Sequence, residues 1–75
     1  MEYIILIHKS EEGGYWSEVP SLPGCFSQGD TIEETILQTR EAIELHIAVL
    51  REDHSDIPHD EEFIISTVKI DSVPA

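Results

Sequence analysis

The stretch EVPSLPGCFSQGDTIEE, residues 18–34, constrains the fold of this 75-residue chain more than any other. Pro20 lacks a backbone N–H group and therefore ends a strand. Pro23 and Gly24 suit positions i+1 and i+2 of a type II turn, because the second of these positions requires a positive φ. The stretch therefore predicts a structural corner at which a small sheet passes the chain on to a helix.

A helix is predicted to begin directly after this corner. Thr31 and Glu34 have the spacing of a capping box, and Asp30 with Glu33 is an equally good register for the cap. The apolar positions that follow fall within a narrow arc at 100° per residue, which indicates a core-facing stripe. That stripe consists of Ile32, Ile36, Ile43, Ile47 and Leu50.

Four segments have the composition of strands, three before the helix and one after it. Residues 2–10 are β-branched and aromatic, and two glycines in the following EEGG suit a hairpin turn into a second strand at 15–20. A short third strand spans 25–28 and is closed by Gly29. After an acidic linker, FIISTVKI at 63–70 reads as the last strand.

The order β-β-β-α-β predicts an α+β fold with one helix on one face of a four-stranded mixed sheet. A right-handed crossover would place the last strand parallel to the first and give the spatial order 3-2-1-4. One helix cannot cover both faces, so we expect the open face to be an interface. Candidate residues for an oligomer or partner surface are Ile4, Leu6, Tyr15 and Trp16 on the sheet, and Glu33, Glu41 and Glu44 on the helix.

The chain is strongly acidic, with 16 acidic and four basic residues and a formal net charge of −12. Such a charge repels nucleic-acid phosphates and favours basic partners, so we expect no direct binding to DNA or RNA. The N-terminus lacks a basic region, and its apolar run is too short for a signal peptide or a membrane span. We therefore expect a soluble cytoplasmic protein with a single domain over residues 1–75.

Catalytic and metal sites are both weakly indicated. Cys25 is the single cysteine, which excludes an intramolecular disulfide, and no histidine has a recognisable motif with it. Packing as a small hydrophobe within the corner is the favoured interpretation. His54 and His59 lie in the acidic linker 52–62, where a metal site is conceivable but a solvated linker is favoured. The sequence therefore predicts no enzyme, no cofactor and no metal.

The stretch from Gly13 to Ile47 closely resembles the HicB-like antitoxins. The shared pattern has the form G-G-Y-x-x-x-[VF]-P-x-[LF]-P-G-C-x-[ST]-x-G-[DE]-[TS], followed by the acidic helix, and the block from Pro20 to Thr31 is its specific part. Thr35 stands where the family usually has alanine. The shared residues are those of the corner and the cap: Pro20, Pro23, Gly24, Cys25, Gly29, Asp30, Thr31 and Glu34.

The resemblance implies a partial RNase H-like fold and a role in neutralising a small basic mRNA interferase of the HicA type. It also implies a homo-oligomer, a dimer or a tetramer. The nuclease activity of complete RNase H-like folds is not expected, because the first and last strands offer no acids for a two-metal site. Many family members continue into a DNA-binding domain, whereas this chain is expected to have none. An alternative function is a toxin-independent accessory protein that binds a ligand or a metal on the same scaffold.

Overall fold

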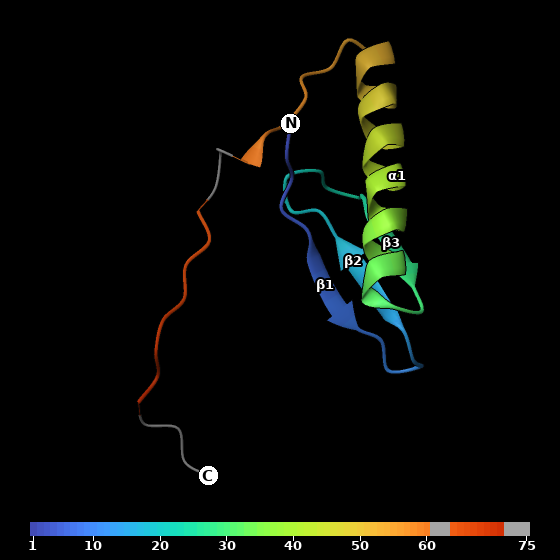
Figure 1. The fold of residues 1–75 in the computed structure, drawn as a ribbon. Coiled ribbons are helices and arrows are strands. Elements are labelled where there is room, and N and C mark those ends of the chain that lie inside the picture. The colour runs from blue at the N-terminus through green and yellow to red at the C-terminus, as the bar shows by residue number, and fades with distance from the viewer. Residues whose placement is uncertain (61–63, 72–75) are drawn as a thin grey trace.

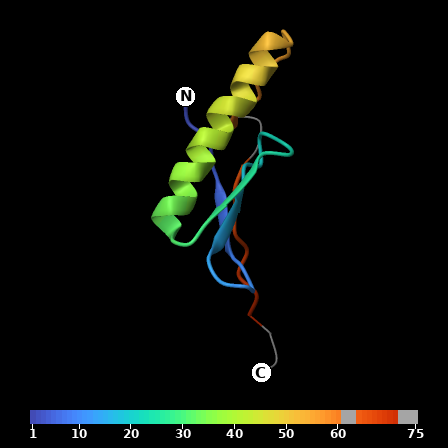
Figure 2. The same ribbon diagram turned by 90° about the vertical axis from the view of Figure 1, so that its right-hand side faces the viewer.

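A computed structural model describes residues 1–60 and 64–71 of the chain. Three strands form one antiparallel sheet in the order β1-β2-β3, and a single helix crosses one face of it (Figures 1 and 2). The elements are β1 at Leu6–Lys9, β2 at Tyr15–Glu18, β3 at Phe26–Gly29 and α1 at Ile32–Glu52. The predicted α+β class is confirmed, with three strands before one helix.

Glycine makes the hairpin between β1 and β2 possible. Gly13 and Gly14 have φ values of +99° and +73°, which side chains rarely allow. The turn is closed by two backbone hydrogen bonds, from Ser10 N to Gly14 O at 3.0 Å and from Gly13 N to Ser10 O at 3.2 Å. The turn fixes the register in which His8 lies opposite Trp16.

The corner between β2 and β3 supplies the core. Leu22 accepts a hydrogen bond from Cys25 N at 3.0 Å across Pro23 and Gly24, and Gly24 has the positive φ of +85° that a type II turn requires. Val19, Leu22 and Cys25 are buried under the helix, with Tyr3, Ile5, Ala42, Ile43 and Leu50 packed against them. The corner thus supplies buried apolar side chains beneath the helix, although many of its residues are turn residues.

Thr31 is the N-cap of α1. Of the two predicted registers for the cap, the structure therefore has the one with Thr31 and not the one with Asp30. Its hydroxyl accepts a hydrogen bond from Glu34 N at 3.0 Å, and Glu33 and Glu34 lie in the first turn. Arg51 lies in the last turn, where a positive charge is favourable.

Hydroxyl groups, and not the predicted isoleucine stripe, occupy the centre of the contact between helix and sheet. Ser17, Thr35 and Thr39 are buried, whereas Ile32 and Ile36 are each 46% exposed. The prediction of a core-facing stripe is therefore wrong for these two isoleucines. The reason is that the backbones of α1 and β3 lie very close together. A Cβ atom on Gly29 would lie 2.7 Å from Thr35 N, so only small side chains fit between the two elements.

The predicted fourth strand and the order 3-2-1-4 are not shown by the structure. Residues 64–70 form no strand and are exposed, and Phe63 lies outside the described residues. The segment runs on the β1 side of the sheet in the same direction as β1 and separated from it (Figure 1). The sheet that the structure describes therefore ends at β1.

None of the helices in the described part of the chain is long and apolar enough to cross a membrane.

Candidate protein-binding surfaces

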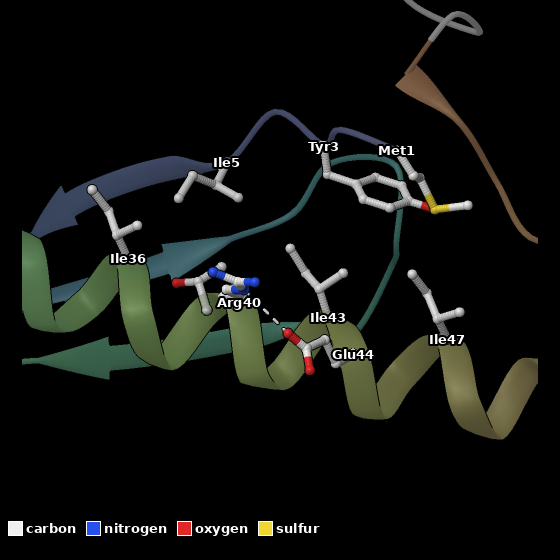
Figure 3. A pocket seen from close by; sticks show the side chains of 9 residues that line it. Met1, Tyr3, Ile5, Ile36, Arg40, Ile43, Glu44 and Ile47 are labelled. Atoms are coloured by element: carbon white, nitrogen blue, oxygen red, sulfur yellow. Dashed lines mark hydrogen bonds and ion pairs between the residues drawn. The ribbon is translucent and has the colours of Figure 1, made fainter.

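Three surfaces of the described structure are candidates for binding. The first is a groove between α1 and the chain that leads into β1, with a volume of about 490 Å³ (Figure 3). The apolar side chains that line it come from both sides: Met1, Tyr3 and Ile5 from the N-terminal segment, and Ile36, Ile43 and Ile47 from α1. We name this the β1 groove.

The N-terminal wall of the β1 groove is held by the segment that follows α1. The Tyr3 hydroxyl donates a hydrogen bond to Pro58 O at 2.7 Å, and the Ile4 amide donates to the Asp60 carboxylate. Ser21 donates to the other carboxylate oxygen of Asp60 at 2.7 Å. Asp60 thus ties the chain after the helix to the start of the sheet and to the corner.

The second surface is the face of the sheet that α1 does not cover, which we name the outer face. Side chains at alternate positions of a strand point to the same face of a sheet. Two sets of cross-strand neighbours, which we call rungs, therefore make up the outer face. They are Leu6, Glu18 and Phe26 in one rung and His8, Trp16 and Gln28 in the other.

An aromatic row runs across the outer face. The rings of His8 and Trp16 stack with their centroids 4.2 Å apart and 19° between their planes. Phe26 lies at a tilt to Trp16, with centroids 6.4 Å apart. Glu18 Oε2 lies 2.8 Å from His8 Nε2, so the one carboxylate of this face is already hydrogen-bonded.

The third surface is the solvent side of α1. Glu33, Glu41 and Glu44 are all exposed there. Arg40 Nε lies 3.2 Å from Glu44 Oε1, in an exposed pair one turn apart. The helix therefore presents negative charge that this pair offsets only in part.

The candidate residues of the sheet do not all share one surface. Leu6 and Trp16 both lie on the outer face. Tyr15 precedes Trp16 in β2, so its side chain points to the opposite face of the sheet, and it is half-buried. Ile4 is half-buried, with its amide bonded to Asp60. Sequence reasoning did not include Phe26 in this surface; its place opposite Glu18 in the register of β2 and β3 puts it there.

Cys25 lies in the core and has none of the features of a nucleophile. Its side chain is buried, and burial raises the pKa of the thiol above its ordinary value. A reactive cysteine requires the opposite shift, toward the thiolate. The Cys25 side chain therefore packs within the corner.

No group of three or more potential metal ligands exists among residues 1–60 and 64–71. In the linker, His54 has a positive φ of 55° just after α1. Both carboxylate oxygens of Asp60 accept hydrogen bonds, one from the Ser21 hydroxyl and one from the Ile4 amide. The part of the linker that is described thus works as a structural connection between helix and sheet.

These features define a small acidic α+β domain with exposed apolar and acidic surfaces, which is a class suited to binding other proteins. Residues 3–71 match the family described as "HicB_like antitoxin of bacterial toxin-antitoxin system". The chain belongs to this family, as the resemblance in the corner and cap predicted.

Individual relatives agree with this membership. The UPF0150 protein Ta0767 of Thermoplasma acidophilum is 43% identical over 80% of this chain and 87% of its own length. The UPF0150 protein ssr1765 of Synechocystis is 44% identical over 91% of this chain and 85% of its own.

A solved structure gives the same result. The crystal structure of the antitoxin HicB of Burkholderia pseudomallei superposes with a TM-score of 0.68 and 42% sequence identity over 89% of this chain. This chain spans 48% of the length of that antitoxin.

Proposed function

We propose that this chain is the antitoxin of a type II toxin–antitoxin pair. It binds a small basic HicA-type mRNA interferase by protein–protein contact in the cytoplasm and is not itself an enzyme. The observation that carries the proposal is the family match over residues 3–71, supported by 42% identity to a solved HicB antitoxin.

Charge supports a basic partner. The net charge of −12 raises the rate of encounter with a basic protein, and complementary charge fixes the orientation of docking. The acidic solvent side of α1 is the surface that we assign to this partner, since Glu33, Glu41 and Glu44 lie exposed on one element. The partner's own RNA-binding surface must be positive to bind phosphates, so the same contact would also block RNA.

We further propose that residues 64–70 dock on β1 as a fourth strand, which gives a partial RNase H-like fold with the order 3-2-1-4. Three features support this. One edge of β1 is unpaired within residues 1–60 and 64–71, and Asp60 holds the start of the segment beside Ile4. The open β1 groove is lined by Ile36, Ile43 and Ile47, which belong to the predicted apolar stripe.

The apolar side of the segment fits this groove. Ile64, Val68 and Ile70 alternate onto one side of an extended chain and are 91%, 81% and 65% exposed. Burying such side chains contributes about 1.5–3 kcal/mol each. Docking would also satisfy the unpaired backbone groups at the edge of β1.

Co-expression with a HicA-type toxin tests the function. We expect induction of the toxin alone to arrest growth and induction of both chains to restore it. A soluble complex of the two chains in fixed ratio should be recovered from the same cells. Continued arrest, with this chain abundant and soluble and no complex formed, would exclude the proposed role for that toxin type.

A further inference from the structure

The outer edge of β3 is free to pair with a further strand. In the part of the chain that the structure describes, β3 pairs with β2 and with no other strand. The carbonyl of Cys25 points toward β2, because it accepts a hydrogen bond from Val19 N at 3.2 Å. Backbone groups of successive residues point to opposite sides of a strand, so Phe26 and Gln28 turn their N–H and C=O groups outward. Two donors and two acceptors are thus available at this edge.

The sequence of β3 does not block this edge. Edge strands are commonly protected from pairing by lysine, by proline or by a bulge. The residues of β3, FSQG, include neither lysine nor proline. The register with β2 runs without interruption from Phe26 to Gly29, so there is no bulge. An extended chain can therefore add to β3, and its main-chain hydrogen bonds would supply affinity.

An apolar hollow of about 370 Å³ lies beside this edge, between the start of β3 and α1. Its lining includes Phe26 from β3 and Ala42, Leu45, Val49 and Leu50 from α1. Leu45 is 70% exposed and Val49 55%, so the helix side of the hollow is open. In strand addition, such a hollow receives alternate side chains of the added strand and supplies specificity.

Acidic side chains border the hollow on α1. Glu41 lies four residues before Leu45, and Glu52 lies three residues after Val49. Residues at these spacings are neighbours on one side of a helix, and both glutamates are exposed. An apolar hollow with this border fits a segment that carries an apolar side chain next to lysine or arginine.

The basic side chains of α1 do not offset this charge. Arg40 and Arg51 fall about 160–180° round the helix from Ala42, which lines the hollow. A second copy of this chain fits poorly, because it would bring the same acids and a further net charge of −12. Residues 64–70 lie on the β1 side of the sheet, at the opposite edge (Figure 1). Charge and position thus favour a basic partner protein.

We propose that an extended segment of the basic toxin adds to β3 as an edge strand. An apolar side chain of that segment enters the hollow, and its lysine or arginine side chains face Glu41 and Glu52. This inference rests on the proposed function, since the toxin is the basic partner. It specifies that the toxin contact extends from the acidic side of α1 onto the edge of the sheet.

Proline at position 28 tests the added strand without removing a hydrogen bond to β2. Gln28→Pro deletes an outward N–H group, and edge strands tolerate proline in this orientation. We expect the dissociation constant for a purified HicA-type toxin to rise about tenfold or more. Gln28→Ala keeps the N–H group and should leave the constant within about twofold. Circular dichroism and urea denaturation check that both variants keep the fold.

A second pair of variants tests the hollow with the sequence of β3 intact. Val49→Gln places a polar side chain in the hollow and should raise the dissociation constant about fivefold or more. Ile65→Gln is the matched control, because Ile65 is 59% exposed and lies on the β1 side of the sheet. It should leave the constant within about twofold.

Hydrogen exchange reports on the edge directly. The amides of Phe26 and Gln28 should exchange rapidly in the free wild-type chain and slowly in its complex with the toxin. A folded Gln28→Pro variant that binds the toxin as tightly as wild type would overturn the inference, as would rapid exchange of both amides in the complex. Either result leaves the antitoxin function standing, because a complex has formed. A wild-type chain that forms no complex with the toxin would overturn that function together with the inference.

Discussion

At the scale of single residues, buried hydroxyls hold the helix against the sheet. Thr39 donates to Thr35 O at 2.5 Å, so its one proton is used there. The hydroxyl of Ser17 must then be the donor in its 2.6 Å hydrogen bond to Thr39 Oγ1. Thr35 donates in turn to Thr31 O at 2.7 Å, which links this chain of hydrogen bonds to the helix cap.

This arrangement predicts the cost of losing one hydroxyl. Thr39→Val keeps the shape of the side chain but leaves the fully buried Ser17 hydroxyl without an acceptor. We expect the free energy of unfolding, measured by urea denaturation, to fall by about 1–3 kcal/mol. The double variant Ser17→Ala/Thr39→Val removes both partners and should lose less than the two single variants together. Unchanged stability in Thr39→Val would show that these buried hydrogen bonds contribute nothing to the stability of the fold.

Cys25 predicts a pH dependence of stability. Burial raises its pKa above the ordinary value of 9.0, so the folded protein holds the thiol proton more tightly than the unfolded chain does. The resulting stabilisation is complete below the ordinary pKa and is lost as pH rises through the folded-state pKa. We therefore expect the free energy of unfolding to fall with rising pH above about 9, and alkylation of the native thiol to be slow.

The variant Cys25→Ala separates this effect from that of Tyr3. Burial raises the pKa of Tyr3, as does the nearby Asp60 charge, while Arg51 lowers it. Tyr3 thus adds its own loss of stability at high pH. The wild-type chain should lose stability more steeply than Cys25→Ala between pH 8 and pH 10. Parallel pH profiles would show that folding leaves the pKa of the Cys25 thiol unchanged.

At the scale of elements, the turns and the helix cap could be predicted from the sequence. Which face of the helix packs against the sheet could be predicted only in part. The corner, the helix start at Thr31 and the hairpin glycines are local properties, because each depends on the φ preference or side-chain oxygen of one or two residues. The first strand was predicted too long. It starts at Leu6, and the backbone amide of Ile4 just before it donates to the Asp60 carboxylate instead of to a neighbouring strand.

The face of the helix that would be buried could not be read from periodicity alone. The isoleucines recur at helical spacing, but Thr35 and Thr39 are the helix residues buried against the sheet. The reason is that β3 lies very close to α1 at Gly29, where only small side chains fit. Much of the stripe lines the β1 groove instead. Which apolar arc meets the sheet depends on long-range packing that a single sequence does not encode locally.

If residues 64–70 dock on β1, substitutions on the two sides of this segment should change the free energy of unfolding by different amounts. Val68→Asp places a charge on the side assigned to the groove and should lower the free energy of unfolding by about 1–3 kcal/mol. Thr67→Asp lies on the other side of the same segment and should change it by less than about 0.5 kcal/mol. Hydrogen exchange should show protected amides within 64–70. Unprotected amides, with both variants equally stable, would mean that the segment does not complete the sheet.

At the scale of the whole molecule, charge assigns the acidic side of α1 to a basic toxin. Glu33, Glu41 and Glu44 lie exposed there, and a net charge of −12 favours a cationic partner. This assignment predicts that added salt weakens the complex, because salt screens the attraction between the chain and a basic partner.

Charge reversal on α1 tests this assignment. Glu41→Lys/Glu44→Lys should weaken toxin binding by tenfold or more at low salt, about 1.4 kcal/mol, and by less at high salt. Asp71→Lys makes one half of the same charge change at an exposed position away from α1 and serves as the control. Equal loss in both variants would point to net charge alone, not to a docking surface on the helix.

The most direct test of the central claim is a titration of mRNA cleavage by a purified HicA-type toxin with this chain. We predict that cleavage falls linearly with added chain and stops at a fixed molar ratio, as expected when a tight complex removes the toxin from solution. The complex should persist at physiological ionic strength. Full cleavage in the presence of a large molar excess of folded chain would contradict the claim that this protein is an antitoxin for that toxin type.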